Sequence, residues 1–444
     1  MRSQSSPVVI AEDDIQEIFL SNHESQTASV SGVVFNLSTS MVGAGMMSMP
    51  MTLKVLGILP ALSLILFVAF LCDISVEFLL RYTGRVGMSY AEVMNESFGR
   101  IGAVFLQICI TLNNVGGLII YLIIIGDVLS GTKSGDGVVH LGVLQEWFGG
   151  EQWWNQRTMA LLFTLIFILL PFLFLRRLDS LRFSSAVSVF LAVIFVVITS
   201  VIAVNALSRG AIQIPRLLPD KNLSFFNLFT VVPVIVIAFT FHFNVHPMRA
   251  EMSTTSDMPK AVRLSLIFCS MIYGTIGFSG YLLFGEATTD DILSNFDITS
   301  STGVGISPFL NDVIRLSYAL HLMLVFPVMF FALRINVYGL MFPNADAGGR
   351  EFQDQGFWFF YGMTMVLVVS VYLAAISIPN IWIPFQFFGS TTSVCISFIF
   401  PAAVVLQDVD GISGRKDKIL AMGMMAVAVA TSCITMSTNV VNFF

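Results

Sequence analysis

Charged side chains are scarce in this chain. Only 22 Lys and Arg and 28 Asp and Glu occur among 444 residues, so charged residues make up 11% of the total, whereas a soluble domain has about 25%. The mean hydropathy of +0.84 and the long apolar runs indicate a protein that is membrane-embedded over almost its whole length. The net charge of −6 provides no basic surface, so we expect no nucleic-acid partner.

Cysteines are also few, and none lies in a predicted loop. All five fall inside apolar segments without metal-binding spacing, so we expect no structural disulfide, no metal site and no cofactor. No cluster of His and carboxylates lies at one depth, which argues against an enzyme. The first 30 residues contain five acidic residues and no basic region that leads into an apolar run. We expect residues 1–30 to be a disordered acidic cytosolic tail and not a signal peptide.

Apolar windows of about 20 residues predict membrane-spanning helices. The chain contains eleven, so the expected fold class is an all-α polytopic membrane protein that occupies residues 31–444. The windows cover 31–50, 56–81, 101–130, 157–175, 182–206, 225–247, 261–284, 309–333, 356–378, 380–405 and 417–440. The weakest boundary lies at 379–384, where two proline-flanked apolar runs nearly meet.

Lys and Arg are distributed unevenly among the predicted loops. If the N-terminus is cytosolic, fifteen of the 22 lie on the cytosolic side and seven on the other, which agrees with the positive-inside rule. We therefore expect a cytosolic N-terminus and a non-cytosolic C-terminus, because an odd number of spans separates the two ends.

The first predicted span contains Gly43, Ala44 and Gly45 in its middle and Pro50 at its end. Glycine costs about 1 kcal/mol relative to alanine inside a helix, and a spanning segment leaves backbone groups unpaired only where protein or a wet cavity satisfies them. This pattern predicts a discontinuous helix that offers bare N–H and C=O groups to a solute. The alternative is that the glycines only allow close helix packing.

The sixth predicted span is interrupted in a similar way, since Pro247 follows the polar stretch 240–246. Two interrupted spans that lie five apart predict a 5+5 inverted repeat of the LeuT type. Repeat one would comprise 31–206 and repeat two 225–405, with 417–440 as an extra helix.

The chain resembles the amino acid/auxin permease superfamily, and within it the sodium-coupled neutral amino acid transporters and, more closely, the plant and fungal vacuolar amino acid transporters. The segments that carry the resemblance are Phe35-Asn-Leu with Met41-Val-Gly-Ala-Gly-Met, Phe241-His with Val245-His-Pro-Met-Arg-Ala-Glu-Met, Gly280-Tyr-Leu-Leu-Phe-Gly-Glu, and Gly389-Ser-Thr with Phe398-Ile-Phe-Pro. The resemblance implies eleven spans, an inverted repeat, a cytosolic N-terminus and amino acid transport by alternating access.

Two departures bear on the coupling ion. The sodium-coupled branch has asparagine where this chain has Thr39, and threonine where it has Val325, two residues before Pro327. Sodium is a hard cation that binds oxygen ligands, and valine has no side-chain oxygen. The departures favour the vacuolar group and put sodium coupling in doubt.

The two interrupted spans predict a substrate site. A helix N-terminus suits a carboxylate, so we place the substrate carboxylate at the backbone of residues 42–45. We place its ammonium at carbonyls near 238–240, where an unwound span 6 would expose them. The substrate-binding candidates are Val42, Gly43, Ala44, Gly45, Ala238, Phe239, Thr240 and Asn114.

Four residues are candidates for ion or proton coupling: Thr39, His242, His321 and Asp127. Histidine titrates near neutral pH, although a hydrogen-bonded core histidine is the alternative for each. An intramembrane carboxylate is a functional candidate by default, but Asp127 could equally be interfacial at the outer surface.

Near the inner end of span 2, Asp73 and Glu77 are expected to pair with Arg81.

The function expected from the sequence is secondary active transport of neutral or acidic amino acids, sodium-independent or proton-linked. The alternatives are a sodium-coupled neutral amino acid symporter and an amino-acid sensor with little transport. The expected partners are an amino acid, protons or sodium, and the lipid bilayer. A vacuolar or other endomembrane location is favoured over the plasma membrane.

Overall fold

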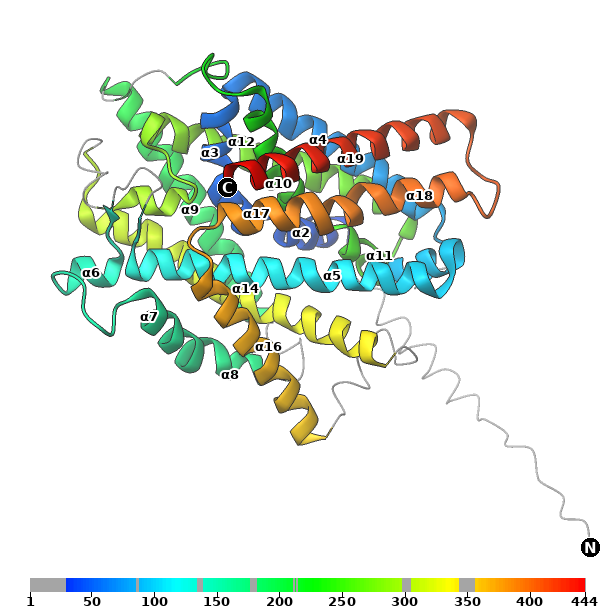
Figure 1. The fold of residues 1–444 in the computed structure, drawn as a ribbon, viewed down its shortest axis with the longest axis horizontal. Helices are drawn as coiled ribbons and strands as arrows, with labels where there is room; N and C mark the ends of the chain where they lie inside the picture. The colour runs from blue at the N-terminus through cyan, green and yellow to red at the C-terminus, as the bar shows by residue number, and fades with distance from the viewer. Residues whose placement is uncertain are drawn as a thin grey trace, which may run out of the picture.

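The described part of the chain is almost entirely helical (Figure 1). The computed structural model describes residues 29–84, 88–133, 139–175, 182–210, 212, 215–297, 305–342 and 356–443. Its only strands within those residues are β1 (Thr132–Lys133) and β2 (Val139–His140), which pair antiparallel. The expected acidic tail, residues 1–30, lies outside the described residues except for its last two positions.

Many of the helices are interrupted by short turns of 3-10 or π geometry, which carry η labels. In chain order the elements are α2 (Val30–Met41), η1 (Ala44–Ser48), α3 (Met49–Leu56), α4 (Ile58–Arg81), α5 (Tyr90–Ser130), α6 (Val143–Trp147), α7 (Arg157–Phe163), η2 (Thr164–Leu169), α8 (Leu170–Leu173), α9 (Arg182–Ser208), η4 (Phe225–Val231), α10 (Val232–Ala238), α11 (His242–Glu251), η5 (Thr255–Asp257), α12 (Met258–Phe284), η6 (Gly285–Ala287), η7 (Ile292–Phe296), α14 (Pro308–Met341), α16 (Phe357–Ser377), α17 (Trp382–Phe388), η8 (Gly389–Ser393), η9 (Cys395–Ile399), α18 (Phe400–Gln407) and α19 (Arg415–Phe443).

The structure supports a polytopic membrane protein. Within the described residues, nine helices are long and apolar enough to cross a bilayer, and ten if the bent pair Val30–Met41 and Ala44–Leu56 forms one span. The fourth predicted span corresponds to Arg157–Leu173, an apolar helix that is shorter than the others and contains the π turn η2. Eleven crossings and the inverted repeat therefore stay predictions.

The spanning helices differ in how deeply they are buried in the bundle. In α5 and in the α17–α18 span, 72% of the most apolar window is buried, against 22% in α19, which lies at the periphery. Figure 1 shows α5 running along much of the molecule beside α17 and α18. Inside a bilayer, helices associate through close packing because lipid is as apolar as leucine, so small residues are expected where these central helices meet.

Gly389 is a small residue at such a meeting point of central helices. It begins the π turn η8 after α17, and a Cβ placed on it would collide with the backbone carbonyl of Pro233 in α10. The glycine thus allows span 10 to pack directly against α10, the first half of span 6.

We predict that Gly389→Ala lowers stability by about 1–3 kcal/mol, the usual cost of overpacking, because the obstacle is backbone and cannot rotate away. The matched control is Gly362→Ala in α16, where an added Cβ meets no atom within 4 Å. Thermal unfolding in detergent should show a lower Tm for Gly389→Ala only. Equal Tm values for both variants would contradict the assigned contact.

Candidate functional site

The first break separates α2 from η1. α2 ends at Met41, η1 begins at Ala44, and the two halves of the span are bent by 57°. The first hydrogen bond of η1 runs from Met46 N to Gly43 O (3.1 Å). The amides of Ala44 and Gly45 precede it and therefore have no partner within the helix. The break thus offers N–H groups at the N-terminus of η1.

The glycines of this break are needed for close packing. Gly43 is extended (φ −151°, ψ −150°), a conformation that any residue adopts. A Cβ on Gly43 would lie 2.6 Å from Tyr121 Oη, and one on Gly45 would lie 2.6 Å from Ala238 Cβ. The close approach inferred from the sequence is therefore made by protein atoms in this structure.

The second break separates α10 from α11. α10 ends at Ala238 and α11 begins at His242, so residues 239–241 belong to neither helix. Unlike the first break, it introduces no bend above 40°, since 225–251 passes as one continuous span. The contact between Gly45 and Ala238 places the two breaks side by side.

One tyrosine hydroxyl joins the two breaks. Tyr273 Oη, in α12, lies 2.7 Å from Met41 O and 2.8 Å from Ala238 O, in a position to donate to both. Each carbonyl belongs to the last turn of a helix that stops at a break, where carbonyls lack intrahelical partners. The single hydroxyl hydrogen of Tyr273 is therefore shared between freed carbonyls at the ends of both helices.

Two further tyrosines complete this arrangement. Tyr318 Oη, in α14, donates to Gly43 O at 2.7 Å, and Tyr121 of α5 lies against Gly43. All three tyrosines are buried. We name Tyr121, Tyr273 and Tyr318 the tyrosine triad. Sequence reasoning missed them, although a signal was present: tyrosine is rare here, with 9 against 41 phenylalanines, and a hydroxyl inside a span needs a partner.

The predicted substrate-binding residues do not all meet. The structure brings residues 42–45 and Ala238 together at the breaks, where Phe239 O accepts a weak contact from Cys72 Sγ (3.8 Å). Thr240 Oγ1 donates to Val236 O (2.8 Å) and lies 3.3 Å from Ser397 Oγ in η9. Asn114 is buried and its Nδ2 has no hydrogen-bond partner among the described residues, but it lies on α5 two turns before Tyr121, roughly 10 Å along the helix axis.

The coupling candidates lie in three places. A cavity of about 440 Å³ between α2, α9, α12 and α14 is lined by Thr39, Val42 and His321, among others. His242 is the first residue of α11, and its Nε2 lies 2.7 Å from Ser75 Oγ of α4. Asp127 lies near the end of α5, with Oδ1 3.5 Å from an Arg157 guanidinium nitrogen. They do not form one site.

Two details adjust the sequence expectations for these residues. Thr39 Oγ1 donates to Phe35 O of its own helix at 2.7 Å, and Asp127 is buried and not an exposed interfacial group. Elsewhere, Glu77 pairs with Arg81 at 2.9 Å as predicted. The prediction for Asp73 was wrong: it pairs with Arg263 at 3.0 Å, because α12 packs against α4.

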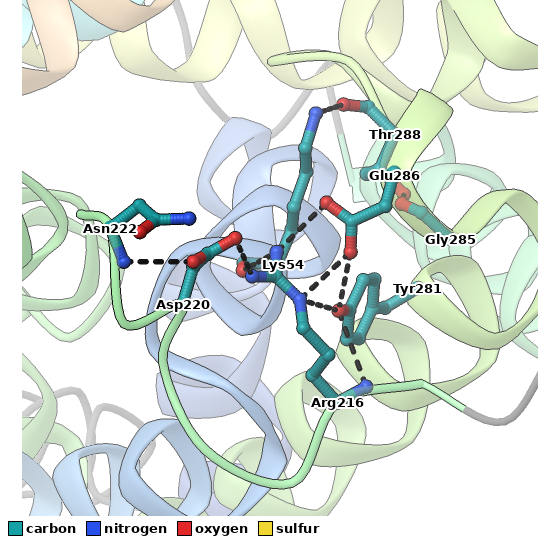
Figure 2. Close-up of polar contacts among 8 residues, drawn as sticks. All are labelled: Lys54, Arg216, Asp220, Asn222, Tyr281, Gly285, Glu286 and Thr288. Atoms are coloured by element: carbon teal, nitrogen blue, oxygen red, sulfur yellow. Dashed lines mark hydrogen bonds and ion pairs between the residues drawn. The ribbon is translucent and has the colours of Figure 1, made fainter.

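A network of ion pairs and hydrogen bonds lies around Lys54 of α3 (Figure 2). Arg216 makes a bidentate contact with Glu286, with Nε–Oε1 at 2.9 Å and a terminal nitrogen–Oε2 at 2.8 Å. It also lies 2.9 Å from Asp220. Lys54 Nζ donates to Thr288 O at 2.9 Å. We name this the outer cluster, after the orientation that the Lys and Arg distribution predicts; it ties the loop before η4 and the residues after α12 to α3.

Freed backbone groups at two adjacent helix breaks, enclosed by apolar spanning helices, are typical of secondary membrane transporters. Comparison with known proteins agrees with this class. Residues 26–439 match the family described as transmembrane amino acid transporter protein, and the chain belongs to that family. The resemblance to the amino acid/auxin permease superfamily is confirmed.

The curated proteins that are similar to this chain over most of its length include two from a plant and one from a fungus. The chain is 49% identical over 419 residues to amino acid transporter AVT6D of Arabidopsis thaliana, covering 94% of this chain and 93% of the relative. It is 50% identical over 422 residues to amino acid transporter AVT6C of the same plant, covering 94% and 95%. It is 26% identical over 378 residues to vacuolar amino acid transporter 5 of Schizosaccharomyces pombe, covering 84% and 82%. These relatives are transporters and not enzymes.

We predict that Tyr273→Phe loosens both breaks together, because it removes the donor that Met41 O and Ala238 O share. Hydrogen–deuterium exchange should accelerate in peptides that cover 38–46 and 236–244. Tyr372→Phe serves as the control, since Tyr372 of α16 also donates to a carbonyl, but to that of Thr158 in α7, at 3.0 Å. Acceleration at one break alone, or at neither, would contradict the bridging role.

Proposed function

We propose that this protein is a secondary active amino acid transporter that works by alternating access and binds its substrate between the two helix breaks. The proposal is supported by the close approach of free backbone N–H donors at one break and free C=O acceptors at the other. The N-terminus of η1 presents the N–H groups of Ala44 and Gly45, and the C-terminus of α10 presents carbonyls from Ala238 onward. A zwitterionic α-amino acid needs donors for its carboxylate and acceptors for its ammonium.

The breaks are in direct contact and the tyrosine triad closes around them. This supports an occluded arrangement, in which substrate would replace contacts that protein atoms now make. Tyr273 Oη holds the carbonyl of Ala238, so release of that carbonyl to a substrate ammonium would also free Met41 O. The proposal thus links ligand binding to rearrangement of both interrupted spans, within eleven spans arranged as a 5+5 repeat and an extra helix.

We further propose that transport is independent of sodium. Thr39 stands where the sodium-coupled branch has asparagine, and its hydroxyl donates to its own helix. The Val325 side chain offers no oxygen ligand for sodium.

Since one similar protein is named a vacuolar transporter, a vacuolar or other endomembrane location with a cytosolic N-terminus fits best. The substrates proposed are neutral or acidic amino acids, and protons are the alternative coupling ion, with His242, His321 and Asp127 as candidate sites.

Reconstitution into liposomes tests this function. We predict counterflow of at least one labelled amino acid from a broad panel, unchanged when sodium is replaced by potassium. Exchange of no amino acid would contradict transport and favour a sensor. Strict dependence on sodium would contradict the interpretation of Thr39 and Val325 and favour a sodium-coupled symporter.

The site itself is tested by Gly43→Val, which places a branched side chain where Tyr121 Oη approaches the break. We predict that counterflow falls to background. Gly423→Val in α19 is the control, because an added Cβ there meets no atom within 4 Å. Both variants are first compared by gel filtration and Tm, so that loss of transport in a folded variant is distinguished from misfolding. Counterflow retained by Gly43→Val would refute the placement.

A further inference from the structure

A short buried segment covers the first break on the side of the outer cluster. We name residues 288–297 the outer lid; it follows η6 and includes η7. Ser48 Oγ, at the end of η1, donates to Asp290 O at 2.8 Å, and Lys54 Nζ donates to Thr288 O, as Figure 2 shows. Residues 291–297 are all buried, and η7 packs against η1, α5 and α14. The outer lid therefore lies between the candidate substrate site and that face.

The outer lid is held together by its own hydrogen bonds, is preceded by a glycine with positive φ, and is joined to the outer cluster by an ion pair. The Asn295 side chain ties the lid to itself and to η6: Oδ1 accepts from Thr289 N at 2.9 Å, and Nδ2 donates to Ala287 O at 2.8 Å. The preceding Gly285 has φ +52°, a left-handed conformation that favours glycine. Glu286, next along the chain, is held by Arg216. A segment tied to itself and entered through a glycine can move as one body when its outer contacts break.

Asp291 is an unusual residue at the centre of this lid. Its side chain caps η7, with Oδ1 accepting from Leu293 N at 3.0 Å. Oδ2 is buried and has no hydrogen-bond partner among the described residues, and the residue is only 4% exposed. An ionised carboxylate buried without a partner is costly, whereas a neutral one needs far less solvation.

No cation contacts Asp291 in the described residues to offset this cost. On the lid itself Asp290 adds a second carboxylate, and α5 adds Asp127. Arg157 lies beside Asp127, and Lys54 donates to Thr288 O at the start of the lid.

On α14, the Tyr318 hydroxyl donates to Gly43 O, and Arg315 pairs with Glu146 and Asp312. At the far end of the lid, His140 Nδ1 lies 3.4 Å from Asp297 Oδ2. Burial, reinforced by Asp127, raises the pKa of the Asp291 carboxyl well above its usual range.

We propose that Asp291 is a proton-binding site that controls the outer lid: the lid is closed when Asp291 is protonated and opens when Asp291 ionises. The proton would reside on Oδ2, while Oδ1 continues to cap η7. Opening would expose the carboxylate to water and release the contacts of Ser48 and Lys54. This proposal concerns the lid and stands whether or not the breaks bind an amino acid.

The sign of the pH effect follows from linkage. In the closed state the pKa of Asp291 is raised by burial, and in the open state it returns toward the ordinary value for aspartate, about 3.9. The closed state therefore binds the proton more tightly, and acid favours closure. As pH rises from about 4 toward the closed-state pKa, the ratio of closed to open lid falls by up to tenfold per pH unit. An acidic compartment on this face would keep the lid shut.

Cysteine accessibility tests the proposal on the full chain in detergent. Ser294, in η7, is buried and is replaced in Ser294→Cys, and labelling by a charged maleimide is followed between pH 5 and pH 8. Asn222→Cys provides the reference, because Asn222 is exposed on the same face and its rate reports the intrinsic pH dependence of thiol reactivity. The chain without either substitution gives the background from native cysteines. We expect the rate ratio of Ser294→Cys to Asn222→Cys to rise at least several-fold with pH.

The decisive comparison adds Asp291→Asn, which keeps the capping oxygen and mimics the protonated state. With it, the rate ratio should stay low at every pH, whereas Asp410→Asn, at an exposed carboxylate in the loop after α18, should leave the rise intact. Hydrogen–deuterium exchange of peptides within 285–297 gives the same readout without an added cysteine. A ratio that does not change with pH, or that rises equally with Asp291→Asn, would overturn the proposal.

Discussion

Satisfaction of backbone groups at two helix breaks is the constraint on which the rest of this structure depends. Inside a bilayer each unpaired N–H or C=O costs several kcal/mol, so a helix stops only where a partner is available. Tyr273 provides one donor that Met41 O and Ala238 O share, and Tyr318 provides a donor for Gly43 O. Because the same hydroxyl serves two helices, the breaks cannot be treated as independent features.

Close packing around the breaks follows from this constraint. Gly45 must lack a side chain because Ala238 lies against it, and Gly43 because the Tyr121 hydroxyl does. Packing and solute binding were alternative explanations of these glycines at the level of sequence, but the two are compatible. Under the proposed function, a bound amino acid would replace the contacts that close the breaks, which the outer lid and outer cluster cover from one side.

Hydrophobic windows and local chemistry predicted much of this fold. Helices occupy the predicted windows because twenty apolar residues have few other solutions in a membrane, and the Gly43–Gly45 signal lies where span 1 bends. Arg157–Leu173 shows the limit, since an apolar run does not fix whether a short, π-distorted helix crosses the bilayer.

The tyrosine triad could not be assigned from sequence, because its members come from three distant helices and meet only in the packed bundle. The same holds for Asp73, whose partner Arg263 lies 190 residues away in the chain. The outer lid was missed for a related reason: its residues lie in a predicted loop, where burial of Asp291 leaves no mark in hydropathy. Local pattern predicts where a helix stops, whereas tertiary contacts decide what satisfies it.

The proposed function requires an amino acid to bind to backbone groups of both breaks at once. The decisive experiment is hydrogen–deuterium exchange of the wild-type chain, with and without a saturating amino acid that it exchanges. We predict that the ligand alters exchange in peptides covering 42–46 and 238–244 together, with amides 44 and 45 protected. A ligand that protects only the cavity lined by Thr39 and His321, or only one of the two breaks, would contradict it.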